Sequence, residues 1–186
     1  EKWVPQMAGS GQLMRRIKRK SGVKYTALTP NITGFDKAID ANCDEVAIFA
    51  SASETFSRKN INCSIVESIE RFVPLIKKAK EMGVAVRGYV SCVIECPYEG
   101  SIDSGEVSKL VKMLIQLGCY EVSLGDTIGK GTPKSVKSLL LDVCREIDPS
   151  KLAGHFHDTN NNAIENVREA ISHGLAVARG TKHACV

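Results

Sequence analysis

The sequence predicts an α/β fold in which parallel strands are joined by helices, as in part of a (β/α)8 barrel. Short apolar runs alternate with amphipathic helical patterns along the chain, and this alternation is typical of a parallel sheet covered by helices. No predicted strand is followed by the glycine-rich fingerprint of a dinucleotide fold or by a P-loop. The chain has 186 residues, whereas a complete barrel usually needs about 250. We therefore expect an incomplete barrel.

Six segments are predicted to be strands because most are rich in Val, Ile or Leu and are bounded by Gly, Pro, Asn or Asp. In chain order they are Lys24–Thr29, Glu45–Ala50, Val84–Ser91, Tyr120–Leu124, Leu152–His157 and Leu175–Ala178. No linker or low-complexity segment separates them, so we expect one domain.

Capping signals predict where helices begin between these strands. A Ser or Asp followed three residues later by Glu forms a capping box, and a Thr-Pro pair supplies an N-cap and a first-turn proline. These signals occur at Ser64 with Glu67, at Asp103 with Glu106 and at Thr132-Pro133, and a last helical pattern covers Ala163 to Ile171. Gly118 and Gly174 are predicted to end two of these helices.

Composition excludes several classes of protein. With 43% hydrophobic and 25% charged residues, the chain can bury a sizeable core and is not a disordered tail. It has no run of 18 apolar residues, so we expect no helical membrane span. The net charge of +4 is mild, and the basic run Arg15, Arg16, Lys18, Arg19, Lys20 lacks interleaved aromatic residues. We interpret this run as a solvated helix face and expect no nucleic-acid partner.

The seven cysteines are interpreted as reduced thiols in a cytosol-like compartment, because their number is odd and no signal peptide precedes them. Cys92 and Cys96 form a C-x3-C pair, but no second pair completes a structural zinc site. Cys185 is interpreted as an incidental thiol, since no base or oxyanion motif surrounds it. Residue 1 is Glu, so a targeting segment could precede the sequence.

The strongest functional signal is His155-Phe156-His157-Asp158 at the end of a predicted strand. Alternate strand residues share a face, so both imidazoles face one way and Phe156 faces the helices. Two imidazoles at the C-terminal end of a barrel strand can bind one divalent cation, and barrel enzymes keep their sites at that end. The alternative is a hydrogen-bonded pair of core histidines. The strand-end position and the following Asp158 favour the cation site.

Polar residues on two other strands are further candidates. Arg87 and Tyr89 share one face of their strand. A buried arginine needs a carboxylate or phosphate partner. Arg87 could therefore form either a structural ion pair or a contact with a ligand. Ser123 lies on the face of Glu121, and Asp126 ends that strand. Asp126 either orients a ligand or caps the next turn.

Several segments together resemble the 3-hydroxy-3-methylglutaryl-CoA lyases. The resemblance runs in order from about residue 2 to residue 178. Asn60-Ile61-Asn62-Cys63-Ser64 and Cys96-Pro97-Tyr98-Glu99-Gly100 are specific to these lyases, whereas the His-x-His pattern is shared with other metal-dependent acyl-CoA lyases and synthases. The remaining matching segments are Lys2–Met7, Leu28–Asn31, Arg87–Cys92, Gly118–Glu121, Ser123–Gly129 and His155–Thr159.

The resemblance implies a (β/α)8 TIM barrel that cleaves hydroxymethylglutaryl-CoA to acetyl-CoA and acetoacetate, in leucine degradation and ketone-body formation. It implies a Mg²⁺ or Mn²⁺ cofactor, an acyl-CoA substrate, a homodimer, and a soluble protein of the bacterial cytoplasm or the mitochondrial matrix. The implied roles are metal ligation by His155 and His157, proton transfer by His155, lining of the acyl site by Ser123 and Asp126, and support from Arg87 and Tyr89.

The sequence also departs from the lyase pattern. The first two strands, with their Arg-Asp and Glu residues, have no counterpart, so residues 1–178 are predicted to form about six of eight strand–helix units. Residues 179–186 are an unmatched tail without the Gly-Leu-Gly-Gly-Cys-Pro loop. An aromatic-glycine pair is replaced by Asn160-Asn161.

These departures define the alternatives. We expect a lyase chain whose own activity is low, and exposed strand edges that limit solubility. One alternative is an inactive fragment that binds CoA or a partner subunit. Another is a related condensing enzyme of the isopropylmalate or homocitrate synthase type.

Overall fold

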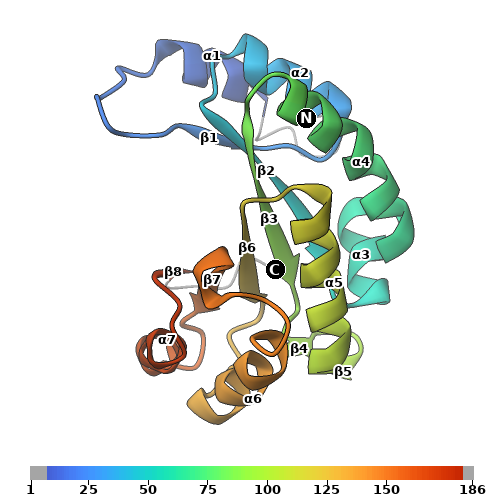
Figure 1. Cartoon of the computed structure of the whole chain (residues 1–186), viewed down its shortest axis with the longest axis vertical. Coiled ribbons are helices and arrows are strands. Elements are labelled where there is room, and N and C mark those ends of the chain that lie inside the picture. Colours follow the sequence, from blue (N-terminus) through green and yellow to red (C-terminus); the bar gives the residue numbers. More distant parts are fainter. Residues whose placement is uncertain (1–7, 182–186) are drawn as a thin grey trace.

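The computed structural model describes residues 8–181 of the chain. Six parallel strands form one curved sheet in the order β1-β2-β3-β6-β7-β8 (Figure 1). Their bounds are β1 Thr26–Leu28, β2 Glu45–Ser51, β3 Ala85–Ser91, β6 Glu121–Asp126, β7 Leu152–His157 and β8 Val177–Thr181. The α/β fold and the partial parallel barrel predicted from the alternating pattern are confirmed. The last strand begins and ends later than predicted, because its ladder with β7 runs from Val177 to Thr181.

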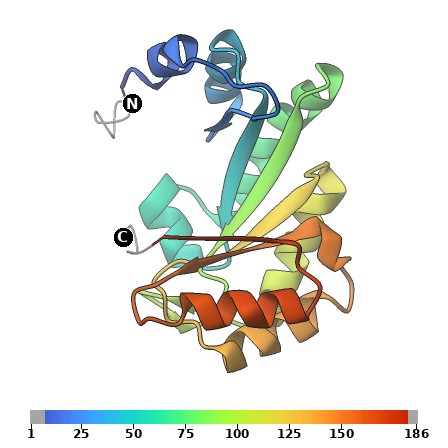
Figure 2. The same cartoon turned by 90° about the vertical axis from the view of Figure 1, so that its left-hand side faces the viewer.

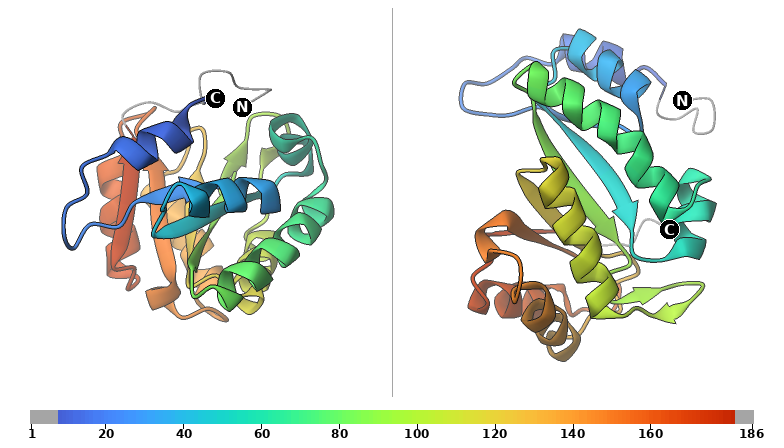
Figure 3. Two further views of the ribbon diagram at one scale, coloured as in Figure 1. Left: turned by 90° about the horizontal axis from the view of Figure 1, so that it is seen from above. Right: turned by 45° about the vertical axis from the view of Figure 1, so that its right-hand side comes forward.

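Helices cover the outer side of this sheet. They are α1 Ser10–Arg16, α2 Ile32–Asp40, α3 Glu54–Ile61, α4 Ile65–Glu81, α5 Ser104–Leu117, α6 Pro133–Val143 and α7 Ala163–Ser172, with a 3-10 turn η2 at Pro149–Lys151. Helices α4 and α5 pack along β2, β3 and β6 (Figure 3). Strands β1 and β8 lie at opposite ends of the sheet (Figure 2).

The predicted N-cap residues begin their helices, but the capping box predicted for Asp103 with Glu106 is not complete, because the Glu106 carboxylate contacts Lys109. Ser64 and Glu67 form a complete capping box at α4, and Thr132 caps α6 ahead of Pro133. Asp103 caps α5 through the amides of Gly105 and Glu106. Gly118 ends α5 with a φ of 124°, a backbone conformation that residues other than glycine rarely adopt.

The strand alternation decides which side chains reach the core. On β3, Val86 and Val90 are buried against the helices while Arg87 and Tyr89 are half-buried on the concave face. Gly88 lies on the helix side, where a Cβ would come within 3.2 Å of both the Leu114 and the Val122 side chains. The concave face is therefore the polar face of this strand.

Two sequence interpretations need correction. The basic run is not one helix face, because α1 ends at Arg16 and Lys18 to Lys20 follow it outside any helix or strand. Arg19 in that stretch pairs with Asp44 at 3.0 Å. A small hairpin of β4 Glu95–Cys96 and β5 Gly100–Ser101 was also not predicted; two-residue strands carry no hydrophobic period.

Among residues 8–181 no helix is long and apolar enough to cross a membrane. The six described cysteines carry free thiols. Cys185 and the Lys2–Met7 segment lie outside the described residues.

Candidate functional site

The C-terminal ends of β6 and β7 bring the histidine pair together with the loop after β6. Both imidazoles of β7 face the same side, while Phe156 is buried in the core, as the alternation predicts. The Nε2 atoms of His155 and His157 lie 3.0 Å apart. Their ring centroids are 4.9 Å apart at an angle of 71°.

His157 is held in one orientation by backbone. Its Nδ1 lies 2.8 Å from the carbonyl oxygen of Thr127. A carbonyl can only accept, so Nδ1 carries the proton and Nε2 presents a lone pair. The Thr127 hydroxyl in turn accepts a 2.7 Å bond from the amide of Cys92, which ties the end of β6 to the turn after β3. A metal-binding histidine needs this second hydrogen bond to fix its tautomer.

The 3.0 Å contact fits both alternatives for the pair: it is a hydrogen bond between the two rings, and it is also the spacing of two neighbouring ligands on an octahedral ion. Ligands at right angles about a cation with bonds of about 2.1 Å are about 3.0 Å apart, whereas tetrahedral ligands are further apart. Within residues 8–181 no group of three or more His, Cys, Asp or Glu side chains could hold a metal. This part of the chain therefore offers at most two imidazole nitrogens to a cation, and two histidines do not by themselves identify the metal.

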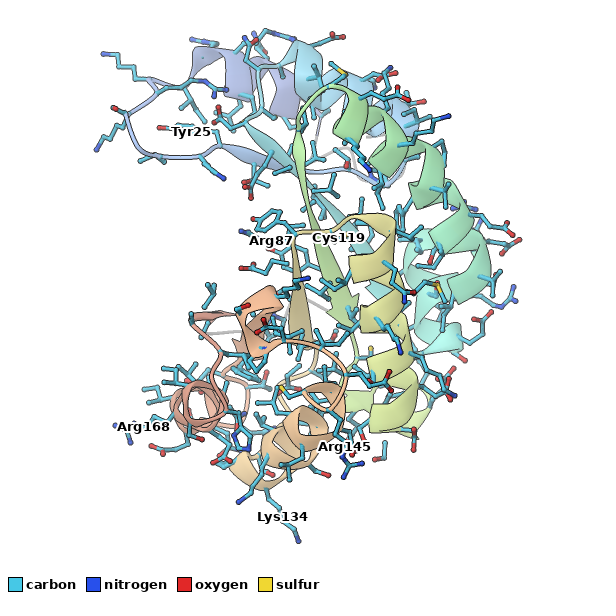
Figure 4. The ribbon with its side chains drawn as sticks, viewed as in Figure 1. Tyr25, Arg87, Cys119, Lys134, Arg145 and Arg168 are labelled. Atoms are coloured by element: carbon cyan, nitrogen blue, oxygen red, sulfur yellow. The ribbon has the colours of Figure 1, made fainter. Side chains whose placement is uncertain are left out.

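Tyr89 links the pair to β3. Its ring packs edge-on against that of His155, with centroids 6.2 Å apart. Arg87 lies two residues earlier on the same face, on the concave side of the sheet (Figure 4). Its guanidinium lies 2.8 Å from a Glu121 oxygen and 3.4 Å from a Glu45 oxygen. These contacts match the ion-pair alternative for Arg87.

Asp126 serves the loop that follows β6. Its carboxylate accepts a 3.1 Å bond from the amide of Lys130 and a 2.8 Å bond from the amide of Gly131. Burial raises the pKa of this carboxyl, while the Gly131 and Lys130 amides act in the opposite direction. The geometry matches the turn-capping alternative.

Ser123 is fully buried on β6, in register with Tyr89 of β3 and Ala153 of β7. Its hydroxyl has no hydrogen-bond partner within the described part of the chain. A buried hydroxyl without a partner is costly, so this group is suited to a ligand or a water molecule.

Asn160 and Asn166 were missed by the sequence reasoning. The Asn160 side-chain amide donates to the carbonyl of Gly129 at 2.8 Å, and that of Asn166 donates to the carbonyl of Gly131 at 3.0 Å. Asn161 adopts a φ of 59°, a conformation that Gly and Asn tolerate best. This explains how asparagine can stand where the lyase pattern has glycine.

A cavity of about 650 Å³ opens at the ends of β1 and β2. Phe49, on its wall, is in register with Tyr89, so the cavity adjoins the strand that contacts His155. Lys59 and Arg71 give the lining two cations. The full lining is Pro30, Asn31, Phe49, Lys59, Asn60, Ile61, Asn62, Ser68, Arg71 and Phe72.

Comparison with known proteins gives a consistent result. The HMGL-like family model matches residues 1–181. The 3-hydroxy-3-isohexenylglutaryl-CoA/hydroxymethylglutaryl-CoA lyase of Pseudomonas aeruginosa is 51% identical over 176 residues, which are 95% of this chain and 59% of that protein. The cytoplasmic 3-hydroxy-3-methylglutaryl-CoA lyase of Danio rerio is 53% identical, with 95% and 52% covered.

Solved structures agree. The HMG-CoA lyase of Brucella melitensis superimposes with a TM-score of 0.94 at 50% identity, covering 96% of this chain and 63% of that one. An Acinetobacter baumannii HMG-CoA lyase in complex with coenzyme A and 3-methylmalate has a TM-score of 0.90 at 28% identity, with 98% and 62% covered. The chain thus spans about half to three-fifths of the length of these relatives.

Proposed function

Because the chain belongs to the HMGL-like family, we propose that it carries the histidine half of a metal-dependent carbon–carbon lyase site. The proposed reaction cleaves 3-hydroxy-3-methylglutaryl-CoA to acetyl-CoA and acetoacetate, in leucine degradation and ketone-body formation. The observation that carries the proposal is the His155–His157 pair, whose Nε2 atoms are 3.0 Å apart. The relatives of about 50% identity are lyases, which favours this reaction over a condensing enzyme.

His155 and His157 would hold the ion, and a bound Mg²⁺ or Mn²⁺ polarises the oxygen atoms of its substrate. By accepting from Nδ1 of His157, the Thr127 carbonyl keeps the Nε2 lone pair of His157 directed toward His155, where the ion would lie. From the family resemblance we also propose proton transfer by His155, the more exposed imidazole of the two. Tyr89 restrains the His155 ring by edge-on packing.

Three further roles follow from the contacts. The partnerless Ser123 hydroxyl is proposed to bind the acyl group. Asp126 is proposed to shape the acyl site by organising the loop after β6. Arg87 is proposed to support the site through its ion pairs with Glu45 and Glu121.

An acyl-CoA substrate is supported by the cavity that Phe49 lines. Lys59 and Arg71 place positive charge in it, and such side chains bind phosphate groups. From the family resemblance alone we further propose a homodimer located in a bacterial cytoplasm or a mitochondrial matrix.

The metal site is tested by titrating the 186-residue chain with Mn²⁺ and following the free ion by electron paramagnetic resonance. We expect saturable binding that His155→Ala and His157→Ala each abolish. His173→Ala is the matched control, because His173 lies at the end of α7 and contacts Glu169. Unchanged binding in the His155→Ala/His157→Ala double variant would refute the site.

Substrate specificity is tested with the Mn²⁺-loaded chain. We expect calorimetric binding of hydroxymethylglutaryl-CoA that weakens in Lys59→Ala and Arg71→Ala. Acetoacetate release is measured in the same samples. Binding without turnover would support the alternative of a CoA-binding fragment, and equal affinity for an unrelated acyl-CoA would argue against lyase specificity.

A further inference from the structure

We propose that Asn160 is a positioning residue for the histidine pair, acting through the loop that follows β6. Its side-chain amide holds Gly129, two residues beyond Thr127, and the Thr127 carbonyl orients His157. Nothing in the sequence patterns assigns a role to this asparagine. The inference rests on the proposed metal site for its consequence, but the orientation of His157 can be measured without metal.

The contacts that carry the proposal join two separate loops. The loop from Asp126 to Gly131 leaves β6, and the loop from Asp158 to Asn162 leaves β7. The Asn160 Nδ2 donates to the Gly129 carbonyl at 2.8 Å. This is a side-chain bond across neighbouring strand ends, at the point where the sheet ladder no longer pairs the backbone.

The two loops lie close together at Gly129. A Cβ on Gly129 would come within 2.6 Å of the Thr159 hydroxyl and within 2.9 Å of the His157 carbonyl oxygen. Gly129 also has a φ of 66° and closes a turn by donating its amide to the Asp126 carbonyl at 3.2 Å. A buried backbone carbonyl needs a donor, and Asn160 supplies one here.

The path from Asn160 to the imidazole is short. Asn160 fixes Gly129, the turn from Asp126 to Gly129 contains Thr127, and the Thr127 carbonyl accepts from His157 Nδ1 at 2.8 Å. If the loop shifts, the acceptor that keeps the proton on Nδ1 shifts with it. The Nε2 lone pair of His157 then loses its fixed direction.

The chain provides a matched control two residues away. Asn162 occupies the N-cap position of α7 but makes no side-chain cap hydrogen bond. Asn160→Ala and Asn162→Ala therefore remove the same chemical group from the same loop. Only the first removes the contact to Gly129.

The direct test is ¹⁵N nuclear magnetic resonance of the histidine side chains in the metal-free 186-residue chain. We expect the Nδ1-protonated tautomer of His157 in the wild type and in Asn162→Ala, and a mixture of tautomers in Asn160→Ala. A His157 spectrum that Asn160→Ala leaves unchanged would overturn the proposal. Urea unfolding of both variants checks that a spectral change is not a general loss of folding.

The second test is Mn²⁺ affinity. Loss of a direct hydrogen-bond partner of a ligating histidine weakens binding by about 10- to 100-fold, and for Asn160→Ala, one contact further away, we expect about 3- to 10-fold. Asn162→Ala should bind like the wild type. If the wild type binds no Mn²⁺, the proposed function fails, while the tautomer measurement still decides the role of Asn160.

Discussion

Two polar clusters share the concave face of the sheet, and they differ in how their groups are paired. Toward the N-terminal ends of the strands, Arg87 lies between the buried carboxylates of Glu45 and Glu121. Toward the C-terminal ends, His155 and His157 place nitrogen atoms 3.0 Å apart. In the first cluster a cation faces two anions, and in the second two groups of the same kind face each other.

This difference separates a structural role from a chemical one. Tyr120 donates to Glu45 at 3.1 Å, and burial raises its pKa to about 12, so it stays a neutral donor in the first cluster. The two imidazoles, by contrast, contact each other through their Nε2 atoms, at the place where the proposed cation would bind. Burial and strand alternation alone did not distinguish Arg87 from the histidines. Their partners do.

The largest effect is expected from breaking the first cluster. Arg87→Met removes the guanidinium that pairs with Glu121 and Glu45 and leaves Glu45 with its 3.5 Å ion pair to Lys24; breaking a buried pair costs about 3–5 kcal/mol of unfolding free energy. Urea unfolding measures this loss. Arg168→Met is the control, because Arg168 pairs with Glu165 on the exposed side of α7, and surface pairs contribute about 0–1 kcal/mol. A similar small loss in both variants would remove the structural assignment of the Arg87 cluster.

A smaller loss is expected from overfilling the second cluster. The Cβ of Gly129→Ala would meet Thr159 and the His157 carbonyl at less than 3 Å, and we expect a loss of about 1–3 kcal/mol from overpacking. Gly22→Ala is the matched control, since Gly22 has a φ of 77° but nothing within 4 Å of the added carbon. Thermal or urea unfolding measures both losses. If Gly129→Ala and Gly22→Ala lose the same unfolding free energy, the loss at Gly129 comes from backbone strain and not from overpacking.

The sequence predicts local features of these clusters because they depend on neighbours in the chain. The period of two along β7 places His155 and His157 together with no knowledge of other strands. The Ser64 capping box and the proline at the start of α6 likewise depend on residues within one turn. These predictions are confirmed because their physics is local.

The partners of the same residues could not be predicted, because they come from distant segments. Arg87 meets Glu45 and Glu121 only after β2, β3 and β6 align in register. The acceptor of His157 is a backbone carbonyl of Thr127, which has no side-chain signature. The Asn160 contact depends on Gly129 approaching a loop that lies about thirty residues further along the chain, and a run of asparagines suggests only a turn.

A third prediction uses alkaline pH to probe the interior beside both clusters. Cys119 precedes Tyr120, and burial raises its thiol pKa from 9.0 to about 12. The contribution of this thiol to the unfolding free energy is fully present below pH 9. It is lost as pH rises toward 12, because the thiol ionises in the unfolded chain before it ionises in the folded protein. At pH 10 the loss is about 1.4 kcal/mol for this thiol.

Urea unfolding between pH 7 and pH 10 measures that loss. Cys119→Ala should be less stable than the wild type at pH 7 through lost packing, and should lose about 1.4 kcal/mol less on going to pH 10. Cys92→Ala should behave alike, since burial also raises the Cys92 pKa to about 12. Parallel pH profiles for the wild type and both variants would contradict burial of these thiols.

The smallest effect is expected at Asn161, whose φ of 59° lies in the left-handed region. Asn161→Ala should cost about 1 kcal/mol, because a Cβ in this region crowds the following carbonyl, whereas Asn161→Gly should change stability by less than about 0.5 kcal/mol. Both values are measured by urea unfolding. If Ala and Gly are equally tolerated, the backbone between Thr159 and Asn162 adapts freely. A freely adapting loop could not hold the Asn160 amide against Gly129, and the second cluster would then depend on the Thr127 and Tyr89 contacts for its order.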